Sequence, residues 1–480
     1  MRTASFVYWT VKLPLMSSTV SYFQEAVRWA PLAGSLRVKE RIQHLRTLKK
    51  VLLSHRIPLQ QALQSDLGRA ATETDVSELF ATTALIDYVI QKLPVWAQKE
   101  HVSVPMTLWP SSASIVHESK GAVLILAPWN YPVSLCLSPL VYALAGGNSA
   151  VVKPSEMAPA SASVVEAILS KAFPEGLVQT VLGDASVAQS LLTHPWNHIF
   201  FTGGPSIGKK VMAAASQHLT SVTLELGGKS PVVLDEHFPL QEAGKLLAWA
   251  KSMNAGQVCI APDYVLVPRK LLGPLVHAFA DGLKALYGED LSSNPDYPRI
   301  IHRRHFDRLM QWHEEASRQS DQVWQPAVPL AEDLFFPPTV YIDPSPACAL
   351  SCEEIFGPLL PLVPYDTLED ALAYIQGKER PLALYILSHS SSFQERVMRN
   401  TRAGATVIND FIIHYMHPEL PFGGVNHSGI GKSHGVWGFR EFTNARSVIK
   451  RRWNLHPTMW LGPPYTGWKK KVVDLLVKYG

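Results

Sequence analysis

The stretch Ala122-Val-Leu-Ile-Leu126, with Pro128-Trp-Asn-Tyr-Pro132 and an apolar run over residues 133–145 behind it, decides the fold class of this chain. It is a short apolar strand that leads through a turn into a helix. The same order recurs at residues 150–152 with 160–172, 177–181 with 186–192, and 198–201 with 207–216. Such alternation predicts a doubly wound α/β fold, in which a parallel sheet carries helices on both faces. Ligands bind to such sheets at the carboxyl ends of the strands.

The rest of the chain divides around this first α/β unit. Apolar residues recur at helical spacing over residues 20–53 and 74–91, whereas residues 102–119 read as an extended edge ribbon because they contain Pro105 and Pro110. Strand and helix patterns resume at residue 221 and continue to about residue 410. The predicted division is a first α/β unit at 16–221 with the ribbon at 102–119 set apart from it, a second α/β unit at 222–415, and a returning segment with a C-terminal arm at 416–480.

Residues 1–15 stand apart as an N-terminal extension. Arg2 and the apolar residues 6–11 weakly resemble a signal peptide, but the run is short and no small-residue cleavage site follows it. Met16 is an equally good natural start. The sequence has no run of eighteen or more apolar residues, so we expect no membrane-spanning helix.

Composition indicates a globular, enzyme-sized protein. The chain has 480 residues, of which 47% are hydrophobic, and this is enough for two or three domains. Its formal net charge of +4 is spread along the chain, so the charge gives no indication of binding to nucleic acid. The densest basic runs, Lys450-Arg-Arg452 and Lys469-Lys-Lys471, suit a solvated face, with peripheral membrane association as the open alternative. Four cysteines without a CxxC pair indicate reduced thiols and a cytoplasmic setting.

The candidate nucleophile is Cys259, in the stretch Asn254-Ala-Gly-Gln-Val-Cys-Ile-Ala-Pro262. A working cysteine must form a thiolate, which requires a nearby base, a positive field or a helix N-terminus. Taken alone, a cysteine between Val258 and Ile260 is more often a small buried hydrophobic residue. Its role therefore depends on the other segments of the chain.

Two further segments carry chemistry. Glu225 ends an otherwise apolar strand and precedes Leu226-Gly-Gly228, and an isolated carboxylate there is costly unless it is paired or used. Burial should raise the pKa of Glu225 toward the range of a general base. An equally good interpretation is that Glu225 forms a structural salt bridge with a nearby lysine. Thr202-Gly-Gly-Pro-Ser-Ile-Gly208 follows a strand and opens a helix, which suits phosphate binding or an ordinary turn.

Other familiar motifs are absent from the sequence. Gly228-Lys-Ser230 and Gly431-Lys-Ser433 resemble the end of a P-loop but lack its first glycine. The sequence has no HExxH, no paired cysteines and no GxSxG, so we expect neither a metal site nor a serine hydrolase.

Taken together, the segments resemble the NAD(P)-dependent aldehyde dehydrogenase superfamily over roughly residues 26–449. The motifs that carry the resemblance are Pro128-Trp-Asn-Tyr-Pro132, Lys153-Pro-Ser-Glu156, Phe201-Thr-Gly-Gly204 with Gly208, Glu225-Leu-Gly-Gly-Lys229, Gly256-Gln-Val-Cys259, Glu354-Ile-Phe-Gly-Pro358 and Pro421-Phe-Gly-Gly424. The chain is most similar to the class 3 and fatty aldehyde dehydrogenase branch, through Tyr131, Ala261-Pro-Asp-Tyr264 and Gly462-Pro-Pro-Tyr465. The resemblance implies a Rossmann-like cofactor domain, a catalytic domain and a small extended oligomerisation element.

The resemblance also implies a mechanism. Cys259 attacks the aldehyde carbon, and the Asn130 amide with the Cys259 backbone N–H holds the oxyanion. Hydride transfer to the nicotinamide leaves a thioester, which a water deprotonated by Glu225 hydrolyses. The implied cofactor residues are Lys153 and Glu156 for the adenosine ribose, Gly203 and Gly208 for the pyrophosphate, Glu354 and Phe356 for the nicotinamide, and Trp129.

NAD is the expected cofactor, because a carboxylate such as Glu156 repels a 2′-phosphate. NADP stays open, because the positive charge of Lys153 partly compensates for this repulsion and members of this branch often accept both cofactors. The implied substrate is a hydrophobic aldehyde, either medium- or long-chain aliphatic or aromatic, with Tyr131, Phe411 and His414 as pocket residues. Alternatives are a coenzyme A-acylating enzyme, against which Glu225 argues, and a cysteine esterase or thioesterase activity of the same site. By analogy with the branch we expect a homodimer, with the 102–119 ribbon or the tail crossing between subunits.

Overall fold

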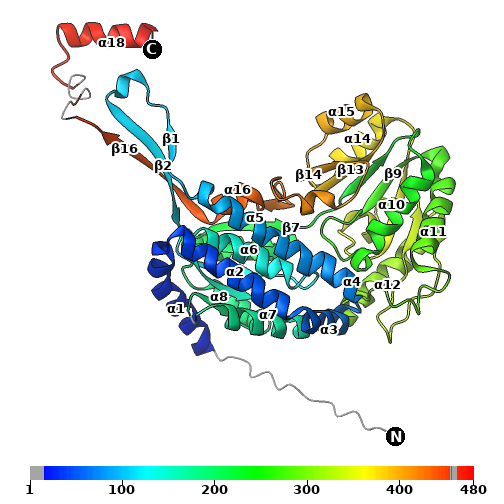
Figure 1. Cartoon of the computed structure of the whole chain (residues 1–480). Helices are drawn as coiled ribbons and strands as arrows, with labels where there is room; N and C mark the ends of the chain where they lie inside the picture. The colour runs from blue at the N-terminus through cyan, green and yellow to red at the C-terminus, as the bar shows by residue number, and fades with distance from the viewer. Residues whose placement is uncertain (1–15, 175, 454–455, 457–461, 480) are drawn as a thin grey trace.

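The computed structural model describes residues 16–174, 176–453, 456 and 462–479. The N-terminal extension expected at residues 1–15 lies outside the described residues. Two sheet-centred units stand side by side, and a narrow ribbon projects from them toward the C-terminal helix (Figure 1). The predicted α/β fold class is confirmed.

The first unit is built on a six-stranded sheet in the order β15-β7-β6-β3-β4-β5, parallel except for β15. Its strands are β3 (Ala122–Leu126), β4 (Ser149–Lys153), β5 (Val178–Thr180), β6 (His198–Gly203), β7 (Ser221–Leu226) and β15 (Gly429–Ile430). The helices that connect them are α6 (Ser134–Ala145), α7 (Pro159–Ala172), α8 (Ala185–Leu192) and α9 (Pro205–Ser216). N-terminal to the sheet lie α1 (Met16–Ser35), α2 (Val38–Ser54), α3 (Arg56–Leu67), α4 (Ala71–Thr74), η1 (Asp75–Phe80) and α5 (Ala81–Trp96).

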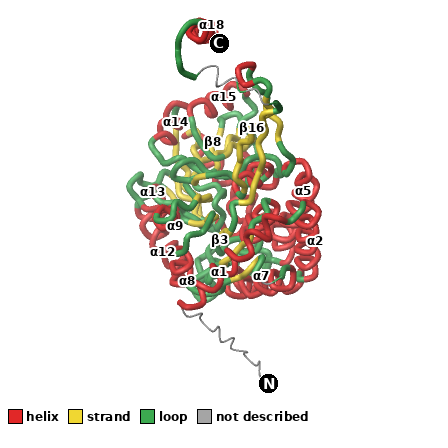
Figure 2. The backbone as a smooth tube through the Cα atoms, turned by 90° about the vertical axis from the view of Figure 1, so that its left-hand side faces the viewer, coloured by secondary structure: helices red, strands yellow, loops and turns green. Residues whose placement is uncertain are grey.

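This sheet is doubly wound because alternate strand residues enter two separate cores. Val123 and Ile125 pack with α2, α3, α5, α6 and α7 on one face, whereas Leu124 and Leu126 pack with α1, α8 and α9 on the other. Figure 2 shows α2 and α5 on one side of the molecule and α8 and α9 on the opposite side. The continuous apolar pattern of these strands follows from burial on both faces.

The boundary between the units differs from the one that the sequence pattern predicted. Strand β7, expected to open the second unit at residue 222, pairs in parallel with β6 and places Thr202 beside Glu225. The first sheet therefore continues through Leu226, and the glycines after it connect to the second unit. Pattern alone could not assign β7, because strands buried in either sheet are equally apolar.

The second unit is built on a seven-stranded sheet in the order β10-β11-β12-β9-β8-β13-β14, with β10 antiparallel. Its strands are β8 (Pro231–Leu234), β9 (Tyr264–Pro268), β10 (Gln322–Trp324), β11 (Thr339–Ile342), β12 (Leu359–Tyr365), β13 (Ala383–Leu387) and β14 (Ala405–Ile408). Its helices are α10 (Leu240–Ser252), η3 (Met253–Gly256), η4 (Arg269–Leu271), α11 (Leu272–Tyr287), α12 (Arg303–Arg318), α13 (Ala349–Cys352), α14 (Leu368–Gln376), α15 (Ser391–Asn400) and η5 (Ile413–Met416).

The projecting ribbon is a three-stranded antiparallel sheet in the order β1-β2-β16. It comprises β1 (Glu100–Val102), η2 (Met106–Leu108), β2 (Ser111–Ser119) and β16 (Thr443–Arg451), the last reached through α16 (Gly435–Glu441). Helix α18 (Trp468–Tyr479) lies beyond it (Figure 1). The extended ribbon predicted at residues 102–119 is thus present, and β16 joins it from the returning segment. Among the described residues, no helix is long and apolar enough to cross a membrane.

Candidate active site

A cavity of about 920 Å³ lies where the carboxyl ends of the first sheet's strands meet the second unit. Segments that are far apart in the sequence supply its walls, and five of them carry residues that the sequence motifs singled out. They are the loop after β3 with Trp129 and Asn130, the turn after β6 with Gly203, the end of β7 with Glu225, the loop with Cys259, and the segment with Glu354 and Phe356. The structure therefore brings together seven of the residues that the sequence motifs singled out.

The loop that carries Cys259 has an unusual backbone. Asn254, Ala255 and Gly256 are three successive residues with positive φ, at 48°, 51° and 70°. A Cβ atom on Gly256 would lie 2.3 Å from the carbonyl oxygen of Gly357, so only glycine fits this close approach. Such conformations persist only when the surroundings hold them in place.

Gln257 holds this loop in place. Its side-chain amide donates to the carbonyl oxygens of Asn254 and Arg299, both at 3.0 Å, and accepts from the Ile301 N–H at 3.0 Å. Because Gln257 is buried, these bonds are protected from water. The cysteine two residues later is therefore presented on a fixed backbone.

Asn130 lies against the same loop. Its side-chain Nδ2 donates to the carbonyl oxygen of Gln257 at 3.1 Å, and only 2% of the residue is exposed. The Asn254 amide reaches back, donating to the carbonyl oxygens of Asn130 and Gln257, each at 3.1 Å. A primary amide carries two N–H groups. Asn130 is thus placed beside Cys259 as an oxyanion-binding group requires.

A buried ion network behind Asn130 was missed by the sequence analysis. Arg69 is fully buried, forms a 3.0 Å ion pair with Glu78 and donates to the carbonyl oxygen of Asn130 at 2.5 Å. Glu78 in turn accepts from the Ser134 N–H at 2.6 Å. Glu78 lies in the π-helical turn η1, a feature often found at functional sites.

The Cys259 loop is tied to the same network. Glu73, one turn before Glu78, accepts from the Asn254 N–H at 3.0 Å and lies 3.9 Å from the Arg69 guanidinium. Asn130 and the Cys259 loop are therefore anchored to one buried arginine. Sequence alone gives no signal of this, because Arg69 and Glu78 belong to no recognisable motif.

Glu225 has the electrostatics of a general base. Burial raises its pKa to about 7, although a hydrogen bond from Ser433 and the nearby Lys432 charge act in the opposite direction. Its place at the end of the apolar strand β7 accounts for the direction of this shift. A carboxylate that titrates near neutrality exchanges protons readily under physiological conditions.

Cys259 is partly exposed at the cavity wall. Burial raises the pKa of its thiol, and the carboxylates of Glu354 and Glu225 raise it further. In this state the sulfur keeps its proton at neutral pH. Nucleophilic attack therefore requires proton transfer to a base, and Glu225 and Glu354 are two nearby carboxylates whose pKa values are raised toward neutrality.

Glu354 reaches the cavity from the second unit. Burial raises its pKa to about 8, and its carboxylate fills the space that a side chain at Gly227 would need, 2.1 Å from the ideal Cβ position. The backbone beside it is held by Asp263, which accepts from the Ile355 N–H at 2.9 Å and pairs with Lys229.

Phe356, in the left-handed conformation at φ 46°, meets Trp129 edge-to-face with ring centroids 5.3 Å apart. The two rings come from opposite units and both line the cavity. Together with Glu354 they form an acceptor and an aromatic surface that suit a ribose and a flat heterocycle.

The turn after β6 suits a pyrophosphate. A Cβ atom on Gly204 would meet nothing within 4 Å, and α9 begins directly behind it with Pro205 in its first turn. The N–H groups at this helix start border the cavity, since Gly203, Gly204 and Ser206 all line it. Gly208 lies inside the helix instead, where a Cβ atom would come 2.7 Å from Leu226, so its glycine permits close packing of helix on strand.

Lys153 and Glu156 form an ion pair of 2.8 Å at the carboxyl end of β4. Lys153 is buried and also donates to the Pro154 carbonyl at 3.1 Å, whereas Glu156 is exposed. Neither borders the 920 Å³ cavity, so their contact with an adenosine ribose stays a prediction.

The three predicted substrate-pocket residues lie outside this cavity. Phe411 is fully buried and packs 4.7 Å from the Tyr385 ring, and His414 stacks on Phe422 at 5.8 Å. The Tyr131 ring lies under the Arg69 guanidinium at 4.7 Å. Their part in substrate binding stays a prediction, and Phe411 can take part only by shaping the wall behind other side chains.

Three tyrosines lie in the neighbourhood of the thiol. The phenol groups of Tyr131, Tyr385 and Tyr415 all lie close enough to Cys259 to interact with it electrostatically. Tyr385 also donates a hydrogen bond to the Ile260 carbonyl next to the cysteine. The sequence analysis named only Tyr131 of these, because the other two lie in no recognisable motif.

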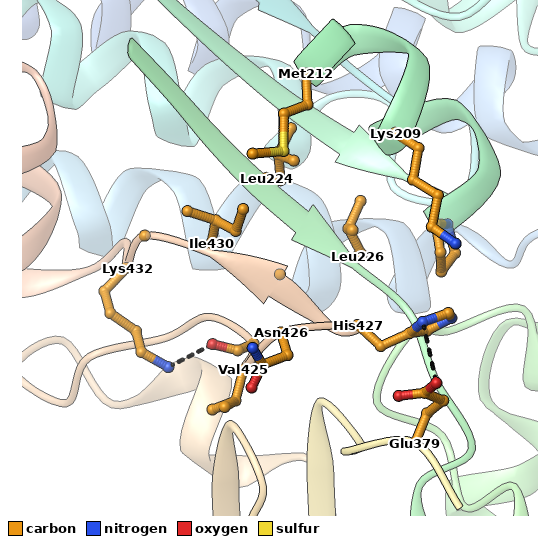
Figure 3. Close-up of a pocket in the computed structure, with 14 residues that line it drawn as sticks. Lys209, Met212, Leu224, Leu226, Glu379, Val425, Asn426, His427, Ile430 and Lys432 are labelled. Atoms are coloured by element: carbon orange, nitrogen blue, oxygen red, sulfur yellow. Dashed lines mark hydrogen bonds and ion pairs between the residues drawn. The ribbon is translucent and has the colours of Figure 1, made fainter.

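A second groove, of about 650 Å³, adjoins the cavity along the outer edge of the first sheet. Figure 3 shows its apolar floor of Met212, Leu224 and Ile430, between α9 and β15. Glu379 and His427, 3.9 Å apart, border both the groove and the cavity.

Comparison with known proteins settles which family this architecture represents. A model described as the aldehyde dehydrogenase family matches residues 17–448. The chain belongs to the aldehyde dehydrogenase family. It is therefore an NAD(P)-dependent oxidoreductase, and the resemblance seen in the sequence motifs is confirmed.

Individual members of the family are similar over nearly the whole chain. A probable coniferyl aldehyde dehydrogenase of Pseudomonas aeruginosa is 38% identical over 428 residues, which cover 89% of each protein. Aldehyde dehydrogenase family 3 member B1 of Bos taurus is 39% identical, over 92% of this chain and 94% of that protein. The substrate-bound structure of Staphylococcus aureus AldH superposes with a TM-score of 0.92 at 33% identity, covering 95% of this chain and 99% of the other.

Proposed function

We propose that this aldehyde dehydrogenase oxidises a hydrophobic aldehyde to the carboxylic acid through a thioester on Cys259, which a Glu225-activated water then hydrolyses. The observation that carries the proposal is the convergence of Cys259, Asn130 and Glu225 on one cavity. The pKa of Glu225, raised by burial to about 7, adds a base of suitable strength.

In the first half of the reaction, the Cys259 sulfur bonds to the aldehyde carbon and its proton passes to Glu225. The carbonyl oxygen becomes an oxyanion that the Asn130 amide and the Cys259 N–H stabilise. Each donor of this kind contributes about 3 kcal/mol in other enzymes. The bound nicotinamide supplies one chemistry, the acceptance of hydride from the substrate carbon, and this leaves a thioester on Cys259.

In the second half, Glu225 gives up the thiol proton to solvent and then takes one from a water molecule. The resulting hydroxide attacks the thioester carbon, the C–S bond breaks, and the acid leaves while the Cys259 thiol is restored. A base that activates water favours hydrolysis over transfer to coenzyme A. Esterase activity of the same thiol is expected as a side reaction.

The residues present fit a nicotinamide dinucleotide. The open turn at Gly204 and the start of α9 suit the pyrophosphate, and Glu354 with Phe356 suits the nicotinamide ribose and ring. Lys153 and Glu156 would hold the adenosine ribose, and the Glu156 carboxylate favours NAD over NADP because it repels a 2′-phosphate.

A hydrophobic substrate is supported by the side chains around the thiol. Tyr131, Tyr385 and Tyr415 lie near Cys259, and Phe422 packs against Tyr415 at 5.0 Å. The relative from Pseudomonas aeruginosa is named for an aromatic aldehyde. We infer that these rings support the walls of a pocket for aromatic or long aliphatic aldehydes.

Absorbance at 340 nm tests the proposal directly. Purified protein with hexanal, decanal or benzaldehyde should reduce NAD, and NADP less well, whereas Cys259→Ala should be inactive with each. Cys352→Ala is the matched control, because this free cysteine also borders the cavity but lies outside the proposed chemistry. Cofactor reduction by Cys259→Ala, or strict dependence on added coenzyme A, would contradict the proposed route.

We further propose a homodimer joined along the ribbon and the outer edge of the first sheet. Apolar side chains are left uncovered there: Leu219 is 93% exposed, and Met106 at the ribbon tip is 94% exposed. Met212 and Ile430 in the groove are also exposed, and a second copy would bury all four. A monomer measured by light scattering at micromolar concentration would contradict this.

Peripheral membrane association is proposed for α18 alone. Its exposed apolar residues Val472, Leu475 and Leu476 share one face of the helix, which Lys471 and Lys478 border, and Lys470 falls on the opposite face. The parent protein should float with phosphatidylserine vesicles more than with phosphatidylcholine vesicles, and Leu475→Glu should abolish this difference. Equal recovery of the parent protein and Leu475→Glu with phosphatidylserine vesicles would contradict membrane association through α18.

All four cysteines are free, which agrees with a reducing, cytoplasmic setting.

A further inference from the structure

The Glu225 carboxylate is held by Ser433, the last residue of the Gly431-Lys-Ser433 segment that only resembles a P-loop. Ser433 lies 208 residues later, between β15 and α16, and its hydroxyl donates a short hydrogen bond to Glu225 Oε1. Both residues are buried. Hydrogen bonds to ionised, buried groups are among the stronger ones in proteins.

The backbone fixes Ser433 before its side chain makes this bond. Its N–H donates to the Phe422 carbonyl at 2.6 Å, and the Phe422 N–H donates to the Ser433 carbonyl at 2.9 Å. The hydroxyl therefore approaches the carboxylate from a preset direction. Such preset geometry is what orients a catalytic group.

His434 completes the arrangement. Its Nδ1 lies 3.3 Å from the Ser433 hydroxyl, and its ring sits between Tyr415 and Phe422, with centroids 4.9 and 5.3 Å away. An ionised carboxylate can only accept, so the single hydroxyl proton of Ser433 points to Glu225. The hydroxyl oxygen is then free to accept from His434, which selects the tautomer with hydrogen on Nδ1.

The relative proton affinities oppose a proton relay through this pair. Burial lowers the pKa of His434 to about 4, whereas the pKa of Glu225 is raised to about 7. A proton that Glu225 has taken from water therefore stays on the carboxyl group and does not pass to the imidazole. Ser433 can orient Glu225, but the pair does not carry protons away.

We propose that Ser433 is a positioning residue for the general base: its hydroxyl orients the Glu225 carboxylate and sets the pH range in which that carboxylate is ionised. The proposal rests on the proposed function of Glu225 in thioester hydrolysis. Other charged or titratable groups also face Glu225, and all of them stay in place when only the Ser433 hydroxyl is removed. They are Lys432, Glu441, Cys259, Tyr142, Tyr415 and His434.

The sign of the expected effect follows from the hydrogen bond. Because Ser433 stabilises the ionised carboxylate, it lowers the pKa of Glu225 against the effect of burial. Without the hydroxyl that pKa rises, so hydrolysis of the acyl-enzyme begins only at higher pH. A hydrogen bond to a charged group corresponds to about one pH unit or somewhat more.

The test compares Ser433→Ala with Ser433→Thr, which keeps the hydroxyl, using p-nitrophenyl acetate between pH 6 and 10. The burst of p-nitrophenol reports acylation of Cys259, and the steady rate reports hydrolysis of the acyl-enzyme. For Ser433→Ala we expect the acid limb of the steady rate to move up by about one pH unit, giving a roughly fivefold loss at pH 7 that recovers at high pH. Ser433→Thr should restore the parent profile.

Three outcomes would overturn the proposal: an unchanged limb in Ser433→Ala, an equal loss at every pH, or a loss in the burst of the same size. Thermal unfolding of both variants is followed in parallel. A lowered unfolding temperature together with an equal loss at every pH would assign Ser433 a role in folding instead of in positioning Glu225. If the parent enzyme itself shows no burst, or no acid limb in its steady rate, the proposed role of Glu225 fails instead. The two failures are thus distinguishable.

Discussion

Glu225→Gln is expected to lower steady-state aldehyde oxidation by a factor of about 10² to 10⁴, the usual contribution of a general base. The amide cannot take a proton from water, so the thioester on Cys259 should persist. Acylation should suffer less than hydrolysis, because a thiol can lose its proton to solvent more readily than water can. Rapid-mixing absorbance at 340 nm should therefore show a first turnover followed by a nearly flat phase.

The matched control is Glu236→Gln. Glu236 is an exposed carboxylate that pairs with Lys270 at 2.5 Å on the surface, so its loss should leave both phases unchanged. A Glu225→Gln enzyme with parent-like steady turnover would show that another group activates the water. Equal loss of both phases would instead assign Glu225 mainly to activation of the thiol.

Arg69→Met is expected to lower the free energy of unfolding by about 3 to 5 kcal/mol, because it leaves Glu78 buried without its partner. The same change releases the Asn130 carbonyl, and through it one side of the oxyanion site. Urea unfolding followed by fluorescence measures the loss of stability. Activity below the unfolding transition should fall as well.

Arg56→Met provides the comparison within the same part of the chain. Arg56 pairs with Asp75 at 2.6 Å, but its side chain is 59% exposed, so its loss should cost less than about 1 kcal/mol. Both variants remove a guanidinium group from an arginine–carboxylate ion pair. The pair of Arg69 is buried, whereas the pair of Arg56 is largely exposed. Similar losses for both would contradict the structural role assigned to Arg69.

The sequence predicted the parts of the site that lie in short, unusual segments. Cys259 stands among small residues, Glu225 ends an apolar strand, and Gly203 follows a strand and precedes a helix. Each departs from the local pattern of an ordinary strand or helix. The alternation of strands and helices likewise predicted the doubly wound sheet.

The parts that the sequence did not predict depend on contacts between distant segments. Arg69 and Glu78 belong to no recognisable motif, and only packing shows that they are buried together behind Asn130. In the sequence Ser433 is one serine in a glycine-rich segment. Only the fold brings it to Glu225, from which it is separated by 208 residues. Phe411 looked like a pocket residue from its aromatic character alone, yet it is fully buried.

The proposed oxidation proceeds through an acyl group on Cys259. Mass spectrometry of Glu225→Gln, quenched after mixing with decanal and NAD, detects this group. We expect a mass increase of one acyl group for the whole protein, located on the peptide that contains Cys259 and absent without NAD. Accumulation of NADH with no acyl group on Cys259, or with an acyl group on another cysteine, would contradict it.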